Sequence, residues 1–302
     1  MALIVTDRLT KQYGGKVTAL SDLSVEFPEG VTGLVGANGA GKSTLIKILL
    51  GLAPATSGSA RVLDLDVATD GGRIRELVGY MPEHDCLPPD VTATELVVHL
   101  GKMSGLPTTA ARERAADTLR HVGLFEERYR PIGGYSTGMK QRVKLAQALV
   151  HDPRLVLLDE PTNGLDPAGR DEMLALIRRI GTAFGISVVV TSHLMGELER
   201  VCDHVVVIDG GRLMRSAATS AVTALTGQLT VEVSDRGPDV EAALVERGVA
   251  VRRVGELLEL ALVDESTYDV VRDVVADLGV GLVRLQRGRQ HMLDMFREGV
   301  AS

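Results

Sequence analysis

The segment that most constrains the fold of this chain is a glycine-rich run at residues 36–44. It consists of Gly36, Ala37, Asn38, Gly39, Ala40, Gly41, Lys42, Ser43 and Thr44. An apolar run at Val31–Val35 precedes it, and residues 43–52 follow it with a helical pattern. Glycines let backbone N–H groups turn inward around an anion, and the N-terminus of a helix adds partial positive charge. The spacing GxxxxGK[ST] therefore predicts a phosphate-binding loop between a buried strand and a helix.

Two side chains of this loop indicate that the bound anion is the phosphate chain of a nucleotide with Mg²⁺. Lys42 can reach the β- and γ-phosphates of a nucleotide, and the Ser43 hydroxyl can ligate Mg²⁺. The alternative is a glycine-rich turn that only happens to contain a lysine, which the strand–loop–helix context disfavours. A dinucleotide-binding loop fits less well, because the Lys-Ser pair after Gly41 has no role in one.

A pair of adjacent carboxylates follows a second apolar run, Leu155–Leu158. Open α/β sheets form their sites at the carboxyl ends of strands, where Asp159 and Glu160 are expected. Asp159 is suited to the Mg²⁺ shell, and Glu160 to positioning or deprotonating an attacking water. The alternative is a strand that ends in a solvated acidic turn.

A third polar stretch, at residues 133–142, contains Ser136 and Gly138 before a helical pattern. Ser136 is predicted to be the N-cap of a helix over residues 137–150. The simpler interpretation is that Ser136 acts only as a helix cap. The functional one is a second anion site, formed by the hydroxyl, the backbone N–H groups and the helix dipole.

Apolar runs and helical patterns alternate up to about residue 215, which predicts an α/β fold with a sheet covered on both faces. Further strands are expected at residues 187–190 and 205–208. Between about residues 85 and 150 the strand pattern stops, and helices are predicted at 92–103, 109–122 and 137–150. We expect residues 1–217 to form one domain with a helical subdomain at about 85–150.

The remainder, residues 218–302, is predicted to be a small α+β domain of split βαβ type. A small, polar stretch at 216–227 is interpreted as the linker. Strands are expected at 229–233, 249–254, 258–263 and 282–285, and helices at 239–247, 268–278 and near 291–297. This part offers no chemistry; a regulatory or dimer-stabilising role is one hypothesis for it.

Composition narrows the function classes. The net charge is −7, which disfavours nucleic acid as a partner. Cys86 and Cys202 lie far apart and outside any CxxC, so neither a disulfide framework nor a zinc site is expected, and a reducing cytoplasm fits best. No apolar run reaches the ~20 residues of a membrane span. The N-terminus has Asp7 and no cationic start, so we expect no signal peptide.

Several of these features occur together with others in one characteristic order. They are Tyr13, the loop 36–44, the segment Tyr135-Ser136-Thr137-Gly138-Met139, the strand and carboxylates at 155–160, the segment Asn163-Gly164-Leu165-Asp166, and Thr191-Ser192-His193. In this set, over about residues 3–215, the chain resembles the nucleotide-binding subunits of ABC transporters. The matches correspond to the adenine-stacking aromatic, Walker A, the signature, Walker B, the D-loop and the switch histidine of that family.

The resemblance implies a P-loop NTPase fold of the ABC type and an ATPase that uses ATP and Mg²⁺. Two copies would sandwich two ATP molecules, with Ser136 and Gly138 of one copy contacting the γ-phosphate held by Lys42 of the other. Glu160 would act on water, and His193 would hydrogen-bond the γ-phosphate. Tyr13 would stack on adenine. The plain alternative for Tyr13 is an ordinary packed aromatic residue, and that for His193 is a loop histidine whose hydrogen bonds are satisfied.

The chain departs from the family pattern in three places. Thr137 replaces a glycine of the signature, and Met139 replaces its glutamine, which removes an amide. Glu83 stands where the family has a glutamine that senses Mg²⁺ and water. A carboxylate can still bind Mg²⁺, but it cannot donate a hydrogen bond and adds negative charge near a polyphosphate. The plain alternative for Glu83 is a surface glutamate.

The resemblance favours an exporter subunit that works with a separate membrane permease, located at the cytoplasmic face of the membrane. The Glu83 variant and the added C-terminal part are typical of such subunits. The alternatives are an importer subunit, a soluble ABC ATPase that acts on ribosomes or DNA, and a scaffold that binds ATP without hydrolysing it. Because Glu160 and His193 are both present, active hydrolysis is expected.

Overall fold

The structure, a computed structural model, describes residues 2–222, 225–255, 257–262 and 266–289. The chain divides into two compact units, Met1–Thr219 and Ser220–Ser302. Each unit has its own sheets and its own apolar core, so each is described by itself. None of the helices within the described ranges has the length and apolarity that crossing a bilayer demands.

The main sheet of the first unit has the order β10-β9-β3-β8-β7-β6. Five neighbouring strands run parallel, and β10 is antiparallel to β9. Every residue of β3, β7 and β8 is buried, as expected for parallel strands covered on both faces. The bounds are β3 Val31–Val35, β6 Val78–Met81, β7 Leu155–Leu158, β8 Ser187–Ser192, β9 His204–Asp209 and β10 Arg212–Ala218.

A second, antiparallel sheet lies in the same unit, and the sequence patterns did not predict it. Its order is β2-β1-β4-β5, formed by β1 Ala2–Tyr13, β2 Val17–Pro28, β4 Ser57–Val62 and β5 Leu65–Asp66. Shifts of register interrupt the pairing of β1 and β2, and Arg8 and Asp22 adopt positive φ of 46° and 55°. Such irregularities break the period-two alternation that reveals a strand in a sequence.

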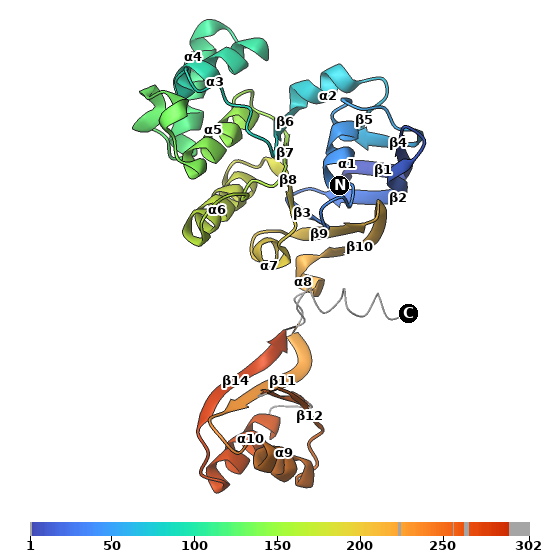
Figure 1. Ribbon diagram of the computed structural model, residues 1–302, viewed down its shortest axis with the longest axis vertical. Helices are drawn as coiled ribbons and strands as arrows, with labels where there is room; N and C mark the ends of the chain where they lie inside the picture. The colour runs from blue at the N-terminus through green and yellow to red at the C-terminus, as the bar shows by residue number, and fades with distance from the viewer. Residues whose placement is uncertain (1, 223–224, 256, 263–265, 290–302) are drawn as a thin grey trace. The chain divides into compact units, whose positions relative to one another are not determined.

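Helices of the first unit pack around the main sheet, and α8 crosses the boundary between the two units. Their bounds are α1 Lys42–Leu49, α2 Gly71–Leu77, α3 Ala93–Met103, α4 Thr108–His121, η1 Glu127–Tyr129, η2 Ile132–Gly134, α5 Thr137–Leu149, α6 Pro167–Ala183, α7 Met195–Leu198 and α8 Thr219–Val222. Helices α3, α4 and α5 agree with the predicted ranges to within about a residue at each end. Figure 1 shows these three gathered on the opposite side of β6 and β7 from β1, β2, β4 and β5.

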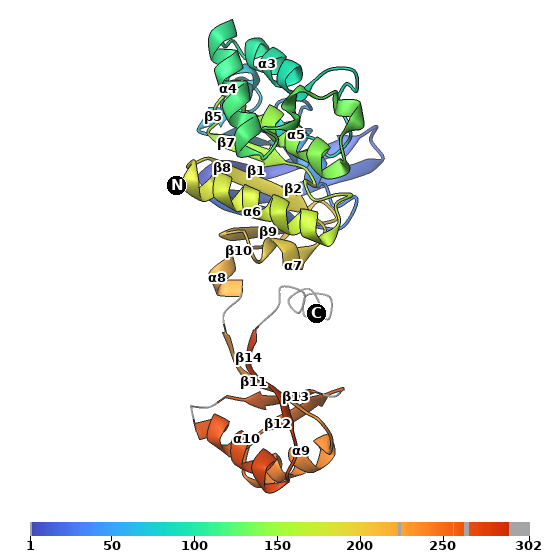
Figure 2. The same ribbon diagram turned by 90° about the vertical axis from the view of Figure 1, so that its left-hand side faces the viewer.

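The second unit is a four-stranded antiparallel sheet of order β12-β13-β11-β14. Its elements alternate as predicted for a split βαβ unit: β11 Leu225–Val233, α9 Gly237–Glu246, β12 Val251–Val254, β13 Leu257–Ala261, α10 Ser266–Asp277 and β14 Leu282–Arg289. Both helices lie on one face of the sheet (Figures 1 and 2). Leu229, Val231 and Leu260 of the sheet pack there against Leu244 and Val274.

The stretch 216–227, interpreted as the linker, contains the boundary between the two units at Thr219 and Ser220, but regular structure occupies its described residues. Ser216 and the two alanines after it extend β10 and pair with β9, where Ser216 Oγ lies 2.8 Å from His204 Nε2. Helix α8 follows, and β11 already begins at Leu225. Small side chains suit an edge strand as well as a loop, so composition could not separate the two. The helix expected near 291–297 lies outside the described residues.

Candidate functional site

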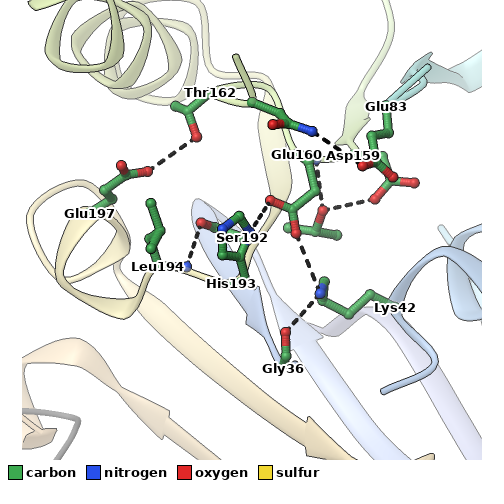
Figure 3. A network of polar contacts seen from close by, with 12 residues as sticks. Gly36, Lys42, Glu83, Asp159, Glu160, Thr162, Ser192, His193, Leu194 and Glu197 are labelled. Carbon is green, nitrogen blue, oxygen red and sulfur yellow. Dashed lines mark hydrogen bonds and ion pairs between the residues drawn. The ribbon is translucent and has the colours of Figure 1, made fainter. Parts of the chain in front are cut away.

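The predicted site residues of the first unit follow four neighbouring parallel strands. The glycine-rich loop follows β3, Asp159 and Glu160 follow β7, His193 follows β8, and Glu83 follows β6. Because parallel neighbours end at the same edge of a sheet, these segments converge there. Figure 3 shows Lys42, Glu160 and His193 directed toward one another at this edge.

The shape of the loop 36–44 depends on two glycines that admit no side chain. A Cβ on Gly36 would lie 2.4 Å from the Ile208 carbonyl oxygen, and one on Gly41 would lie 2.5 Å from that of Ala19. Gly41 also adopts φ of 105°, which L-residues rarely adopt. The backbones of β2 and β9 therefore pack directly against the loop. The loop continues into the first turn of α1.

Lys42 is buried and binds across the loop. Its Nζ donates a hydrogen bond of 2.7 Å to the Gly36 carbonyl and lies 3.4 Å from Glu160 Oε1. Both side chains of this ion pair are 7% exposed. A buried charge is costly unless it is compensated, so the pair holds the ammonium and the carboxylate at the mouth of the loop.

Glu160 is held by backbone and side chain alike. Its φ is 49°, a left-handed conformation that costs about 1 kcal/mol or more in a non-glycine residue. Its backbone N–H donates to Thr191 Oγ1 at 2.8 Å, and that hydroxyl donates to Asp159 Oδ1 at 2.8 Å. Thr191 thereby orients the Asp159 carboxylate and fixes the backbone of Glu160. It was missed as a site residue, although it stands two positions before His193 in the same short motif.

The two carboxylate oxygens of Glu160 have different surroundings. Oε2 lies 3.0 Å from His193 Nδ1, whereas Oε1 is buried, faces Lys42 and has no hydrogen-bond partner. The His193 side chain is 45% exposed. A carboxylate fixed by a partly exposed histidine and keeping one unfilled oxygen is suited to accept a proton.

Glu83 lies in the segment that leads from β6 toward the helices. Its Oε1 accepts a hydrogen bond of 3.3 Å from Asn163 Nδ2, so a neighbouring amide supplies the donor that a carboxylate lacks. Burial, followed by the charges of Asp159, Cys86 and Glu83, raises the pKa of Tyr80 to about 12. The carboxylates of Asp159 and Glu83 thus both raise the pKa of the Tyr80 hydroxyl. Asn163 was not predicted as a site residue and has no sequence signal beyond its motif.

Ser136, Gly138 and Asp166 lie at helix starts. Ser136 caps α5 by accepting from the Met139 N–H at 3.3 Å, and Asp166 caps α6 by accepting from the Gly169 N–H at 3.1 Å. A Cβ on Gly138 would meet Leu165 at 3.8 Å, an ordinary van der Waals distance, so no close contact fills the space beside this glycine. The structure of the single chain does not bring these three residues to the glycine-rich loop.

Tyr13 ends β1 and is 43% exposed. The Lys11 ammonium lies 4.9 Å from the centre of its ring, and the same ammonium donates to the Pro54 carbonyl at 2.6 Å. One face of the ring is therefore backed by a cation, which leaves exposed aromatic surface for another planar group.

A cavity of about 300 Å³ lies at the glycine-rich loop. It is lined by Ala19, Glu83, Glu160 and the loop residues from Ala37 to Thr44. Among the described residues no group of three or more His, Cys, Asp and Glu side chains could hold a metal ion. Nucleotide sites often hold Mg²⁺ with one or two carboxylates, a hydroxyl and the phosphates themselves. Ser43, Asp159 and Glu83 offer such oxygens.

Comparison with known proteins agrees with this geometry. The model of the ABC transporter family matches residues 20–163. The linearmycin resistance ATP-binding protein LnrL of Bacillus subtilis is 35% identical over 80% of this chain and 78% of its own length. The daunorubicin/doxorubicin resistance ATP-binding protein DrrA of Streptomyces peucetius is 34% identical over 83% and 77%.

Solved structures agree on the fold. The cbiO1 protein of Clostridium perfringens, part of the ABC transporter complex cbiONQ, superposes with a TM-score of 0.68 at 27% identity, over 73% of this chain and 90% of that one. The relatives at 34% and 35% identity, which cover about four fifths of this chain, show the family. The chain therefore belongs to the family of ABC transporter ATP-binding proteins and is an ATPase.

Proposed function

We propose that this protein is the energy-coupling subunit of an exporter, acting with a separate membrane permease at the cytoplasmic face of the membrane. The relatives support this by their names: they include resistance proteins for linearmycin and for daunorubicin/doxorubicin, and a Nod factor export protein of Paraburkholderia xenovorans that is 35% identical over 87% of both chains. We propose that the permease selects the transported substrate and that this chain does not bind it.

The observation that carries the proposed chemistry is the contact of Glu160 with both Lys42 and His193. When ATP enters the loop 36–44, the Lys42 ammonium exchanges Glu160 and the Gly36 carbonyl for phosphate oxygens. Glu160 then accepts a proton from the attacking water through the oxygen that has no hydrogen-bond partner. With a proton on each ring nitrogen, His193 donates from Nε2 to the γ-phosphate and from Nδ1 to Glu160.

Mg²⁺ is proposed to be held by Ser43, Asp159 and Glu83 together with the phosphates. When bound, it neutralises negative charge on the phosphates. Thr191 keeps Asp159 oriented toward this position through its 2.8 Å hydrogen bond. Asn163 does the same for Glu83. Tyr13 stacks on the adenine with the ring face that Lys11 leaves free.

A second copy of the chain is proposed to complete the site. Ser136 and Gly138 offer an N-cap hydroxyl and unobstructed backbone at the start of α5, as an anion site requires. Neither lines the cavity that Lys42 lines in its own chain. In the dimer they contact the γ-phosphate bound by the partner, next to Asp166.

A mixing experiment tests the shared site. Lys42→Met removes the phosphate-binding cation, and Ser136→Ala removes the hydroxyl that a second copy would contribute. Neither variant alone forms an intact site. In a mixed dimer both defects fall in one site and leave the other intact, so ATP hydrolysis per chain should rise above that of either variant. A mixture no more active than its components would refute the shared site.

The export direction has its own test. The chain is produced together with a candidate permease, and inside-out membrane vesicles are prepared. ATP should drive accumulation of radiolabelled test drugs inside these vesicles, because their cytoplasmic face is outward. Glu160→Gln vesicles are the control. ATP-driven loss of preloaded compound instead would favour an importer.

A further inference from the structure

One buried cation of the first unit has no part in the chemistry above. Lys144 lies in α5 and is 3% exposed. Its Nζ donates to the carbonyl oxygens of Pro82 and Glu83, both at 2.8 Å, and approaches that of His84 at 3.5 Å. Three consecutive carbonyls thus face one ammonium, which has three N–H donors and no acceptor.

The two segments joined by Lys144 serve different nucleotide sites of the proposed dimer. The carbonyls belong to the segment after β6 that carries the Glu83 side chain. Helix α5 carries Ser136 and Gly138 at its N-terminus, about 12 Å from Lys144 at 1.5 Å per residue. One buried side chain therefore connects the Glu83 segment to the helix that begins with the signature residues.

A second set of hydrogen bonds, through Gln141 and Asn163, also links α5 to Glu83. Gln141, one turn before Lys144 on α5, donates from Nε2 to the Asn163 carbonyl at 3.0 Å. Asn163 in turn donates to the Glu83 carboxylate. Helix α5 therefore holds the Glu83 segment both directly, through Lys144, and through the segment that follows Glu160.

The same helix offers a comparison. Lys140 also reaches toward this segment, and its Nζ lies 3.4 Å from Asp85 Oδ2. That pair is exposed, with side chains 34% and 61% accessible, so it contributes little. Replacing Lys144 instead would leave half-buried carbonyls without their donor, which costs free energy and frees the segment to move.

We propose that Lys144 is a positioning residue that couples the Glu83 segment to α5, so that the Glu83 carboxylate and the Ser136 end of the helix move as one body when ATP binds. This inference rests on the proposed roles of Glu83 and Ser136. Lys144 touches no nucleotide, so binding of the phosphates by the loop 36–44 is independent of it. The coupling affects the hydrolytic step and the response to Mg²⁺.

The test compares Lys144→Met with Lys140→Met in the full chain. Methionine has nearly the volume of lysine and suits a buried position. In K144M we expect kcat to fall on the order of tenfold to a hundredfold, as small misplacements of catalytic groups do. The Mg²⁺ concentration for half-maximal rate should rise severalfold. The ADP dissociation constant should stay within twofold of wild type, a separation that general loss of structure would not produce.

The control variant K140M should match wild type in all three measurements. If K144M behaves like K140M, or if its ADP affinity falls in parallel with kcat, Lys144 is not a positioning residue. Should K144M fail to fold, Lys144→Gln is measured in the same way, since it keeps one donor group at shorter reach. Wild-type protein without ATPase activity would refute the proposed function; active wild type with a silent K144M refutes only this inference.

Discussion

The two units of the chain differ in what they bury. The first buries five charged residues at or near its site: Lys11, Lys42, Lys144, Asp159 and Glu160. In the described part of the second unit, the buried residues are apolar except for Thr267. Burying an uncompensated charge costs several kcal/mol, and a well-packed apolar residue in the same place is often more stable. The first unit therefore gives up stability for chemistry, whereas the second uses its interior for stability alone.

The way each unit handles charge supports this view. Each buried charge of the first unit has a named partner, such as Lys42 with Glu160 or Lys144 with three carbonyls. In the second unit the ion pairs are exposed, as in Arg247 with Asp277 and Arg272 with Asp269. Exposed pairs contribute about 0–1 kcal/mol each. Substitutions in the two units should therefore change different observables.

The largest expected effect comes from Glu160→Gln. The amide keeps the size of the side chain but cannot accept a proton from water, so kcat should fall on the order of 10²–10⁴-fold. ATP should still bind, because the loop 36–44 is intact. Phosphate release measures the first quantity and nucleotide titration the second. Asp85→Asn, an exposed acid nearby, is the control; hydrolysis unchanged in E160Q would remove Glu160 from the mechanism.

The next effect should fall on the second unit. Leu260 is fully buried in its core, and Leu260→Ala should destabilise that unit by about 2–5 kcal/mol through lost burial and a cavity. ATPase activity below its unfolding temperature should not change, since the first unit has its own core. Thermal unfolding followed by calorimetry measures this. Val254→Ala, at a 44% exposed position of β12, is the control. Loss of ATPase in L260A alone would show that the units are energetically coupled.

The glycine-rich loop is the part of the site most predictable from sequence. Gly36 and Gly41 are required because the backbone of neighbouring strands lies too close to them for a side chain. A glycine at each of these positions is visible in the sequence itself. The buried strands β3, β7, β8 and β9 were also predicted, because short apolar runs between helical patterns indicate strands covered on both faces, but their order in the sheet was not. The position of Asp159 and Glu160 at a carboxyl end of a strand was predicted for the same reason.

The contacts between segments were not predictable in the same way. Thr191, Asn163 and Lys144 act through hydrogen bonds to residues 32, 80 and 61 positions away. No local pattern marks a threonine that holds one carboxylate and the backbone of the next residue, or a lysine that faces three carbonyls. The antiparallel sheet was missed because its bulges interrupt alternation. In the second unit the pattern predicted the elements but offered no site, because its polar groups are solvated.

A smaller effect is expected at Tyr13, which is exposed yet placed in the first unit. Stacking on adenine should contribute about 0.5–1.5 kcal/mol, so Tyr13→Ala should raise the KM for ATP by roughly twofold to tenfold with kcat nearly unchanged. Tyr13→Phe keeps the ring and should behave like wild type. Steady-state kinetics measures both. Equal KM values for all three proteins would show that the ring is only a packed surface residue.

The smallest effect should come from Arg284→Ala in the second unit. Arg284 Nε lies 3.5 Å from Glu232 Oε2 across neighbouring strands, with side chains 53% and 31% exposed. An exposed pair of this kind should contribute at most about 0.5 kcal/mol, and less at high salt. Urea unfolding at low and high salt measures it, with Gln286→Ala on the same strand as control. A loss above about 1 kcal/mol that vanished in salt would mean that charge stabilises this unit after all, and that the contrast with the first unit lies in where charges are placed rather than in whether they contribute.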